Sequence, residues 1–321
     1  MMEHPAAYVL GLDVGGTKIA GGVVGADGAL RSRRIVPTRA DRGGEALLAN
    51  ALALAEDLAA GARSRGGQVA AIGIGVAELV DADGEVHSSH VLGWERLAVQ
   101  ERFARLAPAV VESDVRAAAR AEARFGAGKG VREFVYVTVG TGISSCLVQD
   151  GRPYAGARGN ALVLASAPLS YTCPHCGARS EQVLEDVAAG PALAARYSRH
   201  TGRADARAEE VLAAAAAGDT AAVEIVRSAG EALGNSVGFL VNVLDPAAVV
   251  VGGGLGLAGG LYWEHVVAAT RAHVWSEATR GLPILPAALG TDSGIIGAAW
   301  TAWERFGLAK VHPDEHPKRD P

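Results

Sequence analysis

Two glycine-rich turns, each set between apolar stretches, restrict the fold of this chain more than any other sequence feature. Residues 8–24 consist of two apolar stretches around Gly15-Gly16-Thr17, and residues 134–148 repeat that arrangement around Gly140-Thr141-Gly142. Apolar strands on both sides of a glycine turn are typical of a β-hairpin. We therefore expect two α/β domains, each opened by a hairpin with glycine at its tip.

Helical and strand patterns alternate along the remainder of the chain. Leucines at three- and four-residue spacings predict a helix over about 45–60. The other expected elements are strands at 70–76, 109–111 and 249–251 and helices at 114–125, 184–197, 208–217, 220–244 and 293–303. This alternation predicts a small α/β domain over 1–115, to which a C-terminal helix at about 304–321 returns, and a large α/β domain over 116–303, with a cleft between them.

Length and composition restrict the classes of function. A chain of 321 residues is long enough for about two domains. Thirty basic and 35 acidic residues give a net charge of −5, which argues against nucleic acid or an anionic membrane as the partner. The uncharged, glycine-rich stretch 247–263 is shorter than a membrane span of ~20 residues. Three cysteines form no disulfide framework and no signal peptide is visible, so we expect a cytoplasmic protein.

Both glycine turns offer the groups that phosphate oxygens require. The first supplies backbone N–H groups, a hydroxyl and a cation at the end of a strand, from Asp13, Gly15, Gly16, Thr17 and Lys18. Such a string alone is more often an ordinary hairpin turn. The second turn, at Gly140, Thr141 and Gly142, changes the interpretation, because two such turns, one per domain, are able to hold one polyphosphate from two sides.

Four motifs, taken in order and spacing, resemble the ROK family of sugar kinases and sugar-responsive repressors, within the hexokinase and actin-like ATPase fold. They are LGLDVGGTK at 10–18, VTVGTGI at 137–143, VVVGGGL at 249–255 and GIIGAA at 294–299. The resemblance extends from about Val9 to Ala302. It implies a two-domain fold of that type with an interdomain cleft.

The resemblance also implies a site for ATP and Mg²⁺. In such kinases the two hairpins hold the ATP phosphates, Asp13 helps to hold Mg²⁺, and the residues matching Gly252, Gly253 and Gly254 lie beside adenosine. Ser113 and Asp114 resemble the family's Asn-Asp pair, which implies that Asp114 is the catalytic base and that Ser113 contacts the acceptor. Judged from the residues alone, an Asp or Ser before a helix is more often an N-cap.

Departures from the family pattern gather at the sugar end of the site. Val163 and Ser166 stand where the family has the glutamate and histidine of a Glu-x-Gly-His run. Losing that charged acceptor costs roughly 1.5 to 3 kcal/mol for a substrate that still needs it. Glu185 matches a family glutamate that contacts the sugar. Glu78 replaces the glycine of a Pro-Gly loop, and it either faces the sugar ring or, as we expect more often of such a residue, is a solvated loop glutamate.

The family's zinc pattern of one histidine and three cysteines is reduced here to Cys173-Pro174-His175-Cys176. Two thiols supply half of the four ligands of a structural zinc site, which argues against zinc. His175 as a substitute ligand and an ordinary turn with two reduced thiols are both left open.

These patterns predict an ATP-dependent kinase that phosphorylates a primary hydroxyl of a hexose-like acceptor. The altered sugar end favours an amino sugar or a cyclitol over glucose. The alternatives are a glucokinase-type hexose kinase and a sugar-binding sensor of the same family without activity. Repressors of the family carry an added N-terminal helix-turn-helix, for which a hairpin that begins by Leu10 leaves no room. The resemblance further implies a homodimer.

Overall fold

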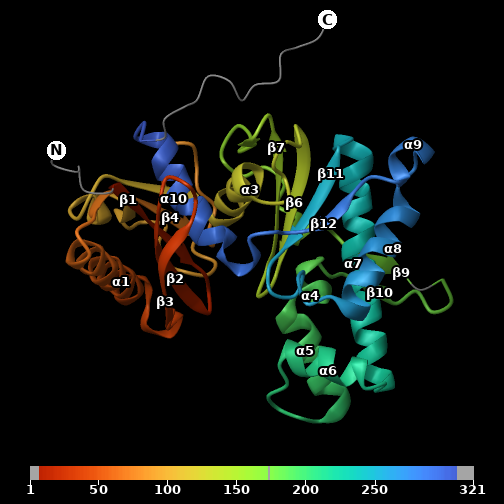
Figure 1. Ribbon diagram of the computed structural model, residues 1–321. Coiled ribbons are helices and arrows are strands. Elements are labelled where there is room, and N and C mark those ends of the chain that lie inside the picture. Colours follow the sequence, from red (N-terminus) through yellow and green to blue (C-terminus); the bar gives the residue numbers. More distant parts are fainter. Residues whose placement is uncertain (1–6, 173, 309–321) are drawn as a thin grey trace, which may run out of the picture. The chain divides into compact units, whose positions relative to one another are not determined.

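The computed structural model describes residues 7–172 and 174–308, which divide into two compact units (Figure 1). Unit 1 comprises Met1–Glu78, Gly84–Asp114 and Ile295–Pro321, of which 1–6 and 309–321 lie outside the described residues. Unit 2 comprises Leu79–Asp83 and Val115–Gly294. Asp114 is therefore the last residue of its segment in unit 1, although the helix that it begins continues into unit 2.

A five-stranded sheet in the order β3-β2-β1-β4-β5 forms the centre of unit 1. Its strands are β1 (Ala7–Val14), β2 (Lys18–Val24), β3 (Leu30–Pro37), β4 (Gln68–Val76) and β5 (Ala109–Ser113). The strands β1, β4 and β5 are parallel, whereas β2 and β3 are antiparallel to their neighbours. The carboxyl ends of β1, β4 and β5 consequently share one edge of the sheet.

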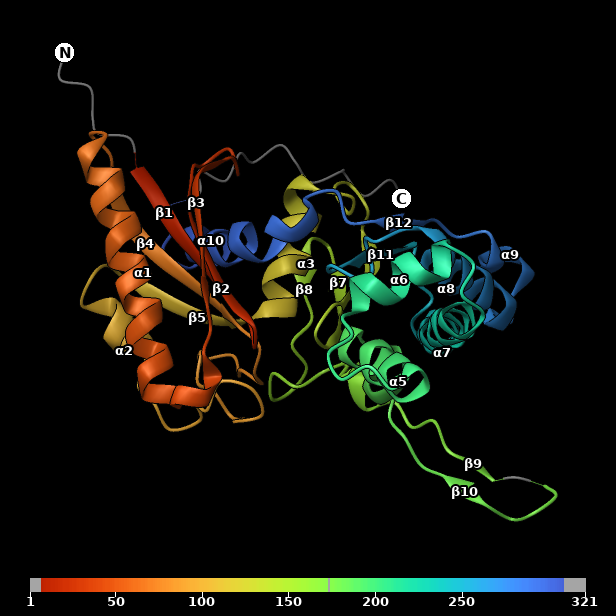
Figure 2. The same cartoon turned by 90° about the horizontal axis from the view of Figure 1, so that it is seen from below.

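Helices cover both faces of this sheet (Figure 2). Leu54 and Leu58 of α1 (Gly44–Ser64) pack on Gly21. On the other face, α10 (Ser293–Arg305) approaches so closely that a Cβ at Gly11 would lie 1.9 Å from the carbonyl oxygen of Ile295. A Cβ at Gly73 would lie 1.7 Å from the carbonyl oxygen of Ala298. Glycine is therefore needed where the strand backbones meet this helix.

Of the expected C-terminal helix at about 304–321, only residues 304–308 belong to the described part of the chain. The helix α10 ends at Arg305, and residues 306–308 are not helical. The helix ends here because Gly307 follows with φ 63°, a conformation that stops a helix. Its buried residues are Ile295, Ile296, Ala298, Ala299, Trp300, Ala302 and Trp303. Residues 309–321 lie outside the described part of the chain.

Unit 2 has its own five-stranded sheet, in the order β12-β11-β6-β7-β8. The strands are β6 (Glu133–Val139), β7 (Ile143–Gln149), β8 (Arg152–Pro153), β11 (Ala248–Gly252) and β12 (Ile284–Pro286). Alternate residues of β6 point to two different cores. Val135 and Val137 belong to the larger one, under the helices that follow β8, while Phe134 and Tyr136 belong to the smaller one with α3 (Asp114–Phe125).

The remaining elements are mostly helices of unit 2. They are α4 (Glu185–Ala188), α5 (Gly190–Thr201), α6 (Ala208–Ala216), α7 (Thr220–Leu244), α8 (Gly260–His273), α9 (Glu277–Arg280), the strands β9 (Tyr171–Thr172) and β10 (Arg179–Ser180), and the 3₁₀ turns η2 (Leu164–Ser166) and η3 (Gly290–Asp292); unit 1 adds η1 (Ala40–Arg42) and α2 (Val99–Ala104). The helix expected over 184–197 is divided at Ala189, because Pro191 favours a new helix start over continuation of the old one.

Within residues 7–172 and 174–308, every helix is too short or too weakly apolar to cross a bilayer.

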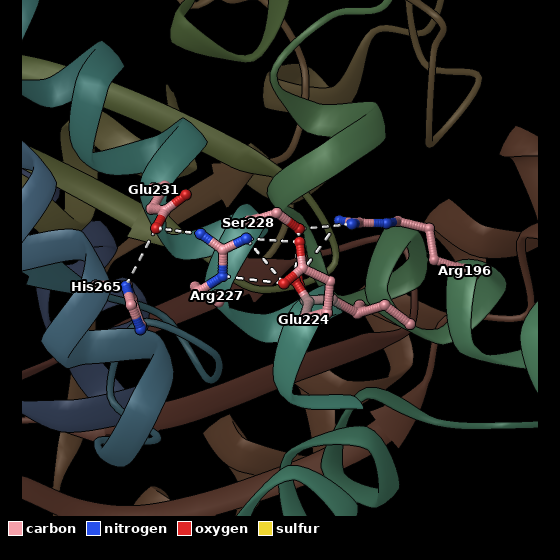
Figure 3. A network of polar contacts seen from close by, with 7 residues as sticks. Arg196, Glu224, Arg227, Ser228, Glu231 and His265 are labelled. Carbon is pink, nitrogen blue, oxygen red and sulfur yellow. Dashed lines mark hydrogen bonds and ion pairs between the residues drawn. The ribbon is translucent and has the colours of Figure 1, made fainter. Parts of the chain in front are cut away.

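Polar contacts join α5, α7 and α8 at their outer surface (Figure 3). Arg227 bonds Glu224 at 2.6 Å and Glu231 at 2.8 Å, and His265 lies 3.6 Å from Glu231. Arg196 reaches from α5 to the hydroxyl of Ser228 at 2.6 Å. Burial is the main reason that the pKa of Arg196 is lowered. These contacts add to the packing of α7 against α8 and lie apart from the predicted site residues.

Candidate functional site

The first predicted phosphate turn joins β1 to β2. Gly15 donates its N–H to the Lys18 carbonyl at 3.1 Å, so this turn is closed by its own backbone. The fully buried Thr38 braces it from behind, because its hydroxyl donates to the Gly15 carbonyl at 2.6 Å and its N–H to the Thr17 carbonyl at 3.1 Å. Sequence reasoning missed Thr38, since a lone threonine after a strand carries no motif.

Asp13 precedes this turn near the end of β1 and is half-buried. Burial raises the pKa of its carboxyl to about 6, although the nearby Lys18 ammonium acts in the opposite direction. Burial away from water disfavours the ionised form. The carboxylate is therefore a group that gains from a cation placed beside it.

Asp13 and Asp114 lie at the same edge of the unit 1 sheet. Val14 pairs with Val76, and Val76 pairs with Ser113, so the end of β1 and the end of β5 are in register with β4 between them. Asp114 follows directly as the first residue of α3, and Ser113 beside it is buried. Parallel strands that end together bring side chains from distant parts of the sequence to one edge.

Glu78, just after β4, is buried, with an exposed fraction of 7%, so the expectation of a solvated loop glutamate is wrong. Its carboxylate accepts hydrogen bonds from the N–H groups of His90, Val91 and Leu92 at 3.1, 2.8 and 2.7 Å and from the Ser88 hydroxyl. Three backbone N–H groups and one hydroxyl of residues 88–92 thus converge on a single carboxylate. We call residues 88–94 the Glu78-held loop.

The Glu78-held loop contacts two other parts of unit 1. A Cβ at Gly16 would lie 2.8 Å from Cγ1 of Val91, which places the loop against the first phosphate turn. At its other end, the buried Trp94 donates its indole N–H to the Gly44 carbonyl at 3.0 Å. The loop therefore joins the first turn to the start of α1.

The second predicted phosphate turn, between β6 and β7, packs on the predicted adenosine loop. Gly140 donates its N–H to the Gly142 carbonyl at 2.9 Å, and its carbonyl accepts from Gly190 at 2.9 Å. The Val139 carbonyl accepts from the N–H groups of Leu255 and Gly256 at 3.0 and 3.1 Å. The structure thus brings Gly140, Thr141 and Gly142 together with Gly252, Gly253 and Gly254 in unit 2. Gly253 has φ +81°, and a Cβ there would lie 2.3 Å from the Val139 carbonyl oxygen.

Glu185 is the first residue of α4 and lies behind the second turn. Its Oε2 accepts the N–H of Ile143 at 2.7 Å and would be 2.8 Å from a Cβ at Gly142. The glutamate matched to a sugar ligand therefore also supports the phosphate turn.

The segment aligned with the Glu-x-Gly-His run is held by groups that the sequence did not single out. Val163 is exposed, at 46%, beside η2. The buried guanidinium of Arg116 donates to the carbonyls of Gly159 and Val80 at 2.5 and 2.7 Å. Arg116 was missed because an arginine inside a helix looks like a solvated surface residue.

The possible zinc site is described only in part. Cys173 lies outside the described residues, and Cys176 is exposed with a free thiol. Among the residues that the structure describes, no three His, Cys, Asp or Glu side chains gather as metal ligands would.

Comparison with known proteins agrees with the fold and with the motifs. Residues 9–305 match the ROK family. The chain is 32% identical over 318 residues to glucokinase from Streptomyces coelicolor, covering 92% of this chain and 97% of that protein. It is 30% identical over 298 residues to N-acetylmannosamine kinase from Escherichia fergusonii, covering 91% and 97%.

A solved structure, that of a ROK family glucokinase from Streptomyces griseus in complex with glucose and AMPPNP, matches with a TM-score of 0.78 at 28% identity, covering 92% of this chain and 99% of that one. The two mixed sheets and their helices confirm the predicted actin-like ATPase fold of the hexokinase type. Since the family match extends over nearly all of the described residues, this chain belongs to the ROK family.

Proposed function

We propose that this protein is an ATP-dependent sugar kinase that transfers the γ-phosphoryl group to a primary hydroxyl of a hexose-like acceptor. The observation that carries the proposal is the pair Asp13 and Asp114 at one edge of a single sheet, separated by β4. Two strand spacings amount to roughly 10 Å. A spacing of this size between the two strand ends leaves room for a cation, a phosphoryl group and an attacking hydroxyl.

The phosphates of ATP bind to the two glycine turns in this proposal. The N–H groups of Gly15 and Gly140 already close their own turns. Binding therefore relies on the other backbone N–H groups there, together with the Thr17 hydroxyl and the Lys18 ammonium. Thr38 and Glu185 hold the turns in shape, which lowers the cost of ordering them around the ligand. Gly252, Gly253 and Gly254 lie beside adenosine.

Asp13 is the residue that would hold Mg²⁺. A single carboxylate suits this ion, because Mg²⁺ is usually bound by one or two carboxylates together with water and substrate phosphates. The half-buried carboxylate, with its raised pKa, also gains from a neighbouring cation. Bound there, the ion would neutralise charge on the phosphates.

Asp114 is the general base. It takes the proton of the acceptor hydroxyl as that oxygen attacks the γ-phosphorus, while the bond to the ADP oxygen breaks. Its place at the first turn of α3 fixes its backbone, and the buried Ser113 beside it contacts the acceptor.

The acceptor is a modified hexose, an amino sugar or a cyclitol, rather than glucose. Val163 and Ser166 offer no carboxylate or imidazole where the family pattern has them. Glu185 retains a carboxylate oxygen for the sugar besides the one bonded to Ile143. Glu78 acts on the acceptor through the loop that it holds, since its carboxylate already accepts four hydrogen bonds from that loop.

The proposal is tested by measuring ADP formation with glucose, N-acetylmannosamine, 3-aminoglucose and a set of cyclitols, each with ATP and Mg²⁺. We expect the highest kcat/KM with an amino sugar or a cyclitol. A preference for glucose would support the glucokinase alternative. Absence of turnover on every acceptor, with sugar binding retained in calorimetry, would overturn the kinase assignment in favour of a sensor.

A further inference from the structure

Unit 1 contains an open groove outside the predicted site residues. It has a volume of about 810 Å³ and lies between the edge strand β3, the turn η1 and the side of α1. Its polar lining comes from Arg34, Arg39, Arg42, Asn50 and Asp57, and its apolar lining includes Leu54. We call it the basic groove. Its volume falls within the range of small-molecule pockets.

The groove carries positive charge that the described structure does not neutralise. Arg34 pairs with Asp57 at 2.8 Å. Among the described residues, no hydrogen bond or ion pair involves the guanidinium of Arg39 or Arg42. The whole chain has a net charge of −5, so a groove faced by two guanidinium groups is a positively charged site on a negatively charged protein. An anion is the ligand class that such a pair recognises.

The backbone that carries these arginines is held in place. Thr38 anchors it to the first phosphate turn through two hydrogen bonds, of 2.6 and 3.1 Å. Arg39 follows with φ 52° and ψ 53°, a left-handed conformation that residues other than glycine rarely adopt. The N–H of Arg42 then donates to the Arg39 carbonyl at 3.1 Å. The guanidinium groups therefore project from a fixed turn, which reduces the entropy lost when a ligand binds.

We propose that the basic groove binds a sugar phosphate monoester, the class of compound that the proposed kinase produces. This inference rests on the proposed function for the identity of the sugar part. A phosphate monoester carries close to two negative charges at pH 7, which matches the two unneutralised guanidinium groups. Each guanidinium is able to bond phosphate through two parallel N–H groups. Asn50, across the groove on α1, supplies an amide for a sugar hydroxyl.

Isothermal titration calorimetry with glucose 6-phosphate as the probe tests the proposal on the full-length protein. We expect saturable binding to the wild type that weakens tenfold or more in the Arg39→Ala/Arg42→Ala variant, because charge-assisted bonds are lost. Arg63→Ala is the matched control, since Arg63 is an exposed arginine of α1 outside the groove, and its isotherm should equal that of the wild type. An unchanged isotherm in the double variant would overturn the groove as a site.

Two further titrations identify the ligand chemistry. Inorganic phosphate and AMP should each bind more weakly to the groove than glucose 6-phosphate. Binding to the groove is the part of each isotherm that the Arg39→Ala/Arg42→Ala variant loses, because AMP also fits the proposed nucleotide site. Equal or tighter groove binding of either ligand would overturn the sugar part of the assignment. Both arginines are exposed, so we expect the double variant to fold. If circular dichroism shows that it does not, the single variants Arg39→Ala and Arg42→Ala replace it. Each single variant should weaken binding severalfold. Because calorimetry requires no turnover, failure of the kinase proposal and failure of the groove are separate outcomes.

Discussion

Asp13 combines a stability cost with a proposed metal-binding role. Its folded-state pKa is about 6 instead of 3.8, because burial disfavours the charged form. The folded protein therefore binds more protons at this residue than the unfolded chain between about pH 4 and pH 6. The contribution of this carboxyl group to the free energy of unfolding is therefore most favourable below about pH 4, where the group is neutral in both states. That contribution is lost as the pH rises through 6, because the buried group must then ionise.

Replacing Asp13 by Asn should consequently stabilise the free protein at pH 8 and abolish its kinase activity. Two pKa units correspond to about 3 kcal/mol, and because Asp13 is half-buried we expect a gain of about 1 to 2 kcal/mol in the free energy of unfolding. Urea unfolding at pH 8 and at pH 4 measures this gain, which should vanish at the lower pH. A variant less stable than the wild type at pH 8 would contradict the burial argument.

Asp114 is the residue whose removal should affect chemistry most. We expect Asp114→Asn to lower kcat by at least ~10², because the amide is unable to take the proton of the acceptor hydroxyl. Steady-state kinetics with the best acceptor measures this loss, and calorimetry checks that the variant still binds nucleotide. Near-normal turnover in a folded variant would remove Asp114 as the base.

Glu78 allows a test of loop organisation against direct sugar contact. In Glu78→Gln the amide nitrogen would face backbone N–H groups in place of a carboxylate oxygen, so the Glu78-held loop should loosen. We expect kcat/KM for the acceptor to fall roughly tenfold, equivalent to losing one or two charge-assisted bonds, with the KM for ATP nearly unchanged. Glu101→Gln, at an exposed position of α2 in the same unit, is the control. Equal losses in both variants would argue against a specific role for Glu78.

At the level of secondary structure, the shape of the first phosphate turn depends on a residue at the end of another strand. Thr38 follows β3 and yet supplies two of the bonds that brace the β1–β2 turn. The hairpin itself closes the turn with the bond from Gly15 to Lys18. The edge strand is thus part of the nucleotide site in the proposed kinase.

Substituting Thr38 separates packing from hydrogen bonding. Thr38→Val keeps the shape and loses the hydroxyl, leaving the Gly15 carbonyl without its side-chain donor. We expect the KM for ATP to rise about five- to tenfold, from a loss of ~1 kcal/mol or slightly more. Thr38→Ser, which keeps the hydroxyl, should lie close to the wild type. If the two variants behave alike in ATP titrations, the hydroxyl has no part in positioning the turn.

Several elements followed from local patterns, and others did not. The helices at 114–125 and 220–244 occur as expected, because their apolar spacing and their flanking residues agree. Strand β3 was not predicted, since its sequence LRSRRIVP has five exposed positions and gains its place by pairing with β2 at the edge of the sheet. The break at Ala189 was missed because 184–197 is apolar enough for one helix.

For the molecule as a whole, unit 2 has two buried apolar cores, and we predict that its stability does not depend on a zinc ion. Its two cores lie on opposite faces of one sheet, whereas the short β9–β10 hairpin near Cys176 is mostly exposed. A chelator with affinity for zinc should therefore leave the Tm unchanged within ~1 °C, and metal analysis of the purified protein should find no stoichiometric zinc. A Tm lowered by several degrees, and recovered on adding zinc, would show that the remaining thiols hold a structural ion.

The sequence by itself determined the two hairpins, the alternation of strands and helices, and the family, because apolar periodicity, glycine turns and motif order are local properties. Only the tertiary structure decided what Glu78, Thr38 and Arg116 do, because each acts on backbone groups distant in sequence. The sequence is the same whether a carboxylate, a hydroxyl or a guanidinium faces solvent or forms hydrogen bonds with a buried loop. Which of the two occurs depends on the unpaired donors and acceptors that folding places beside it.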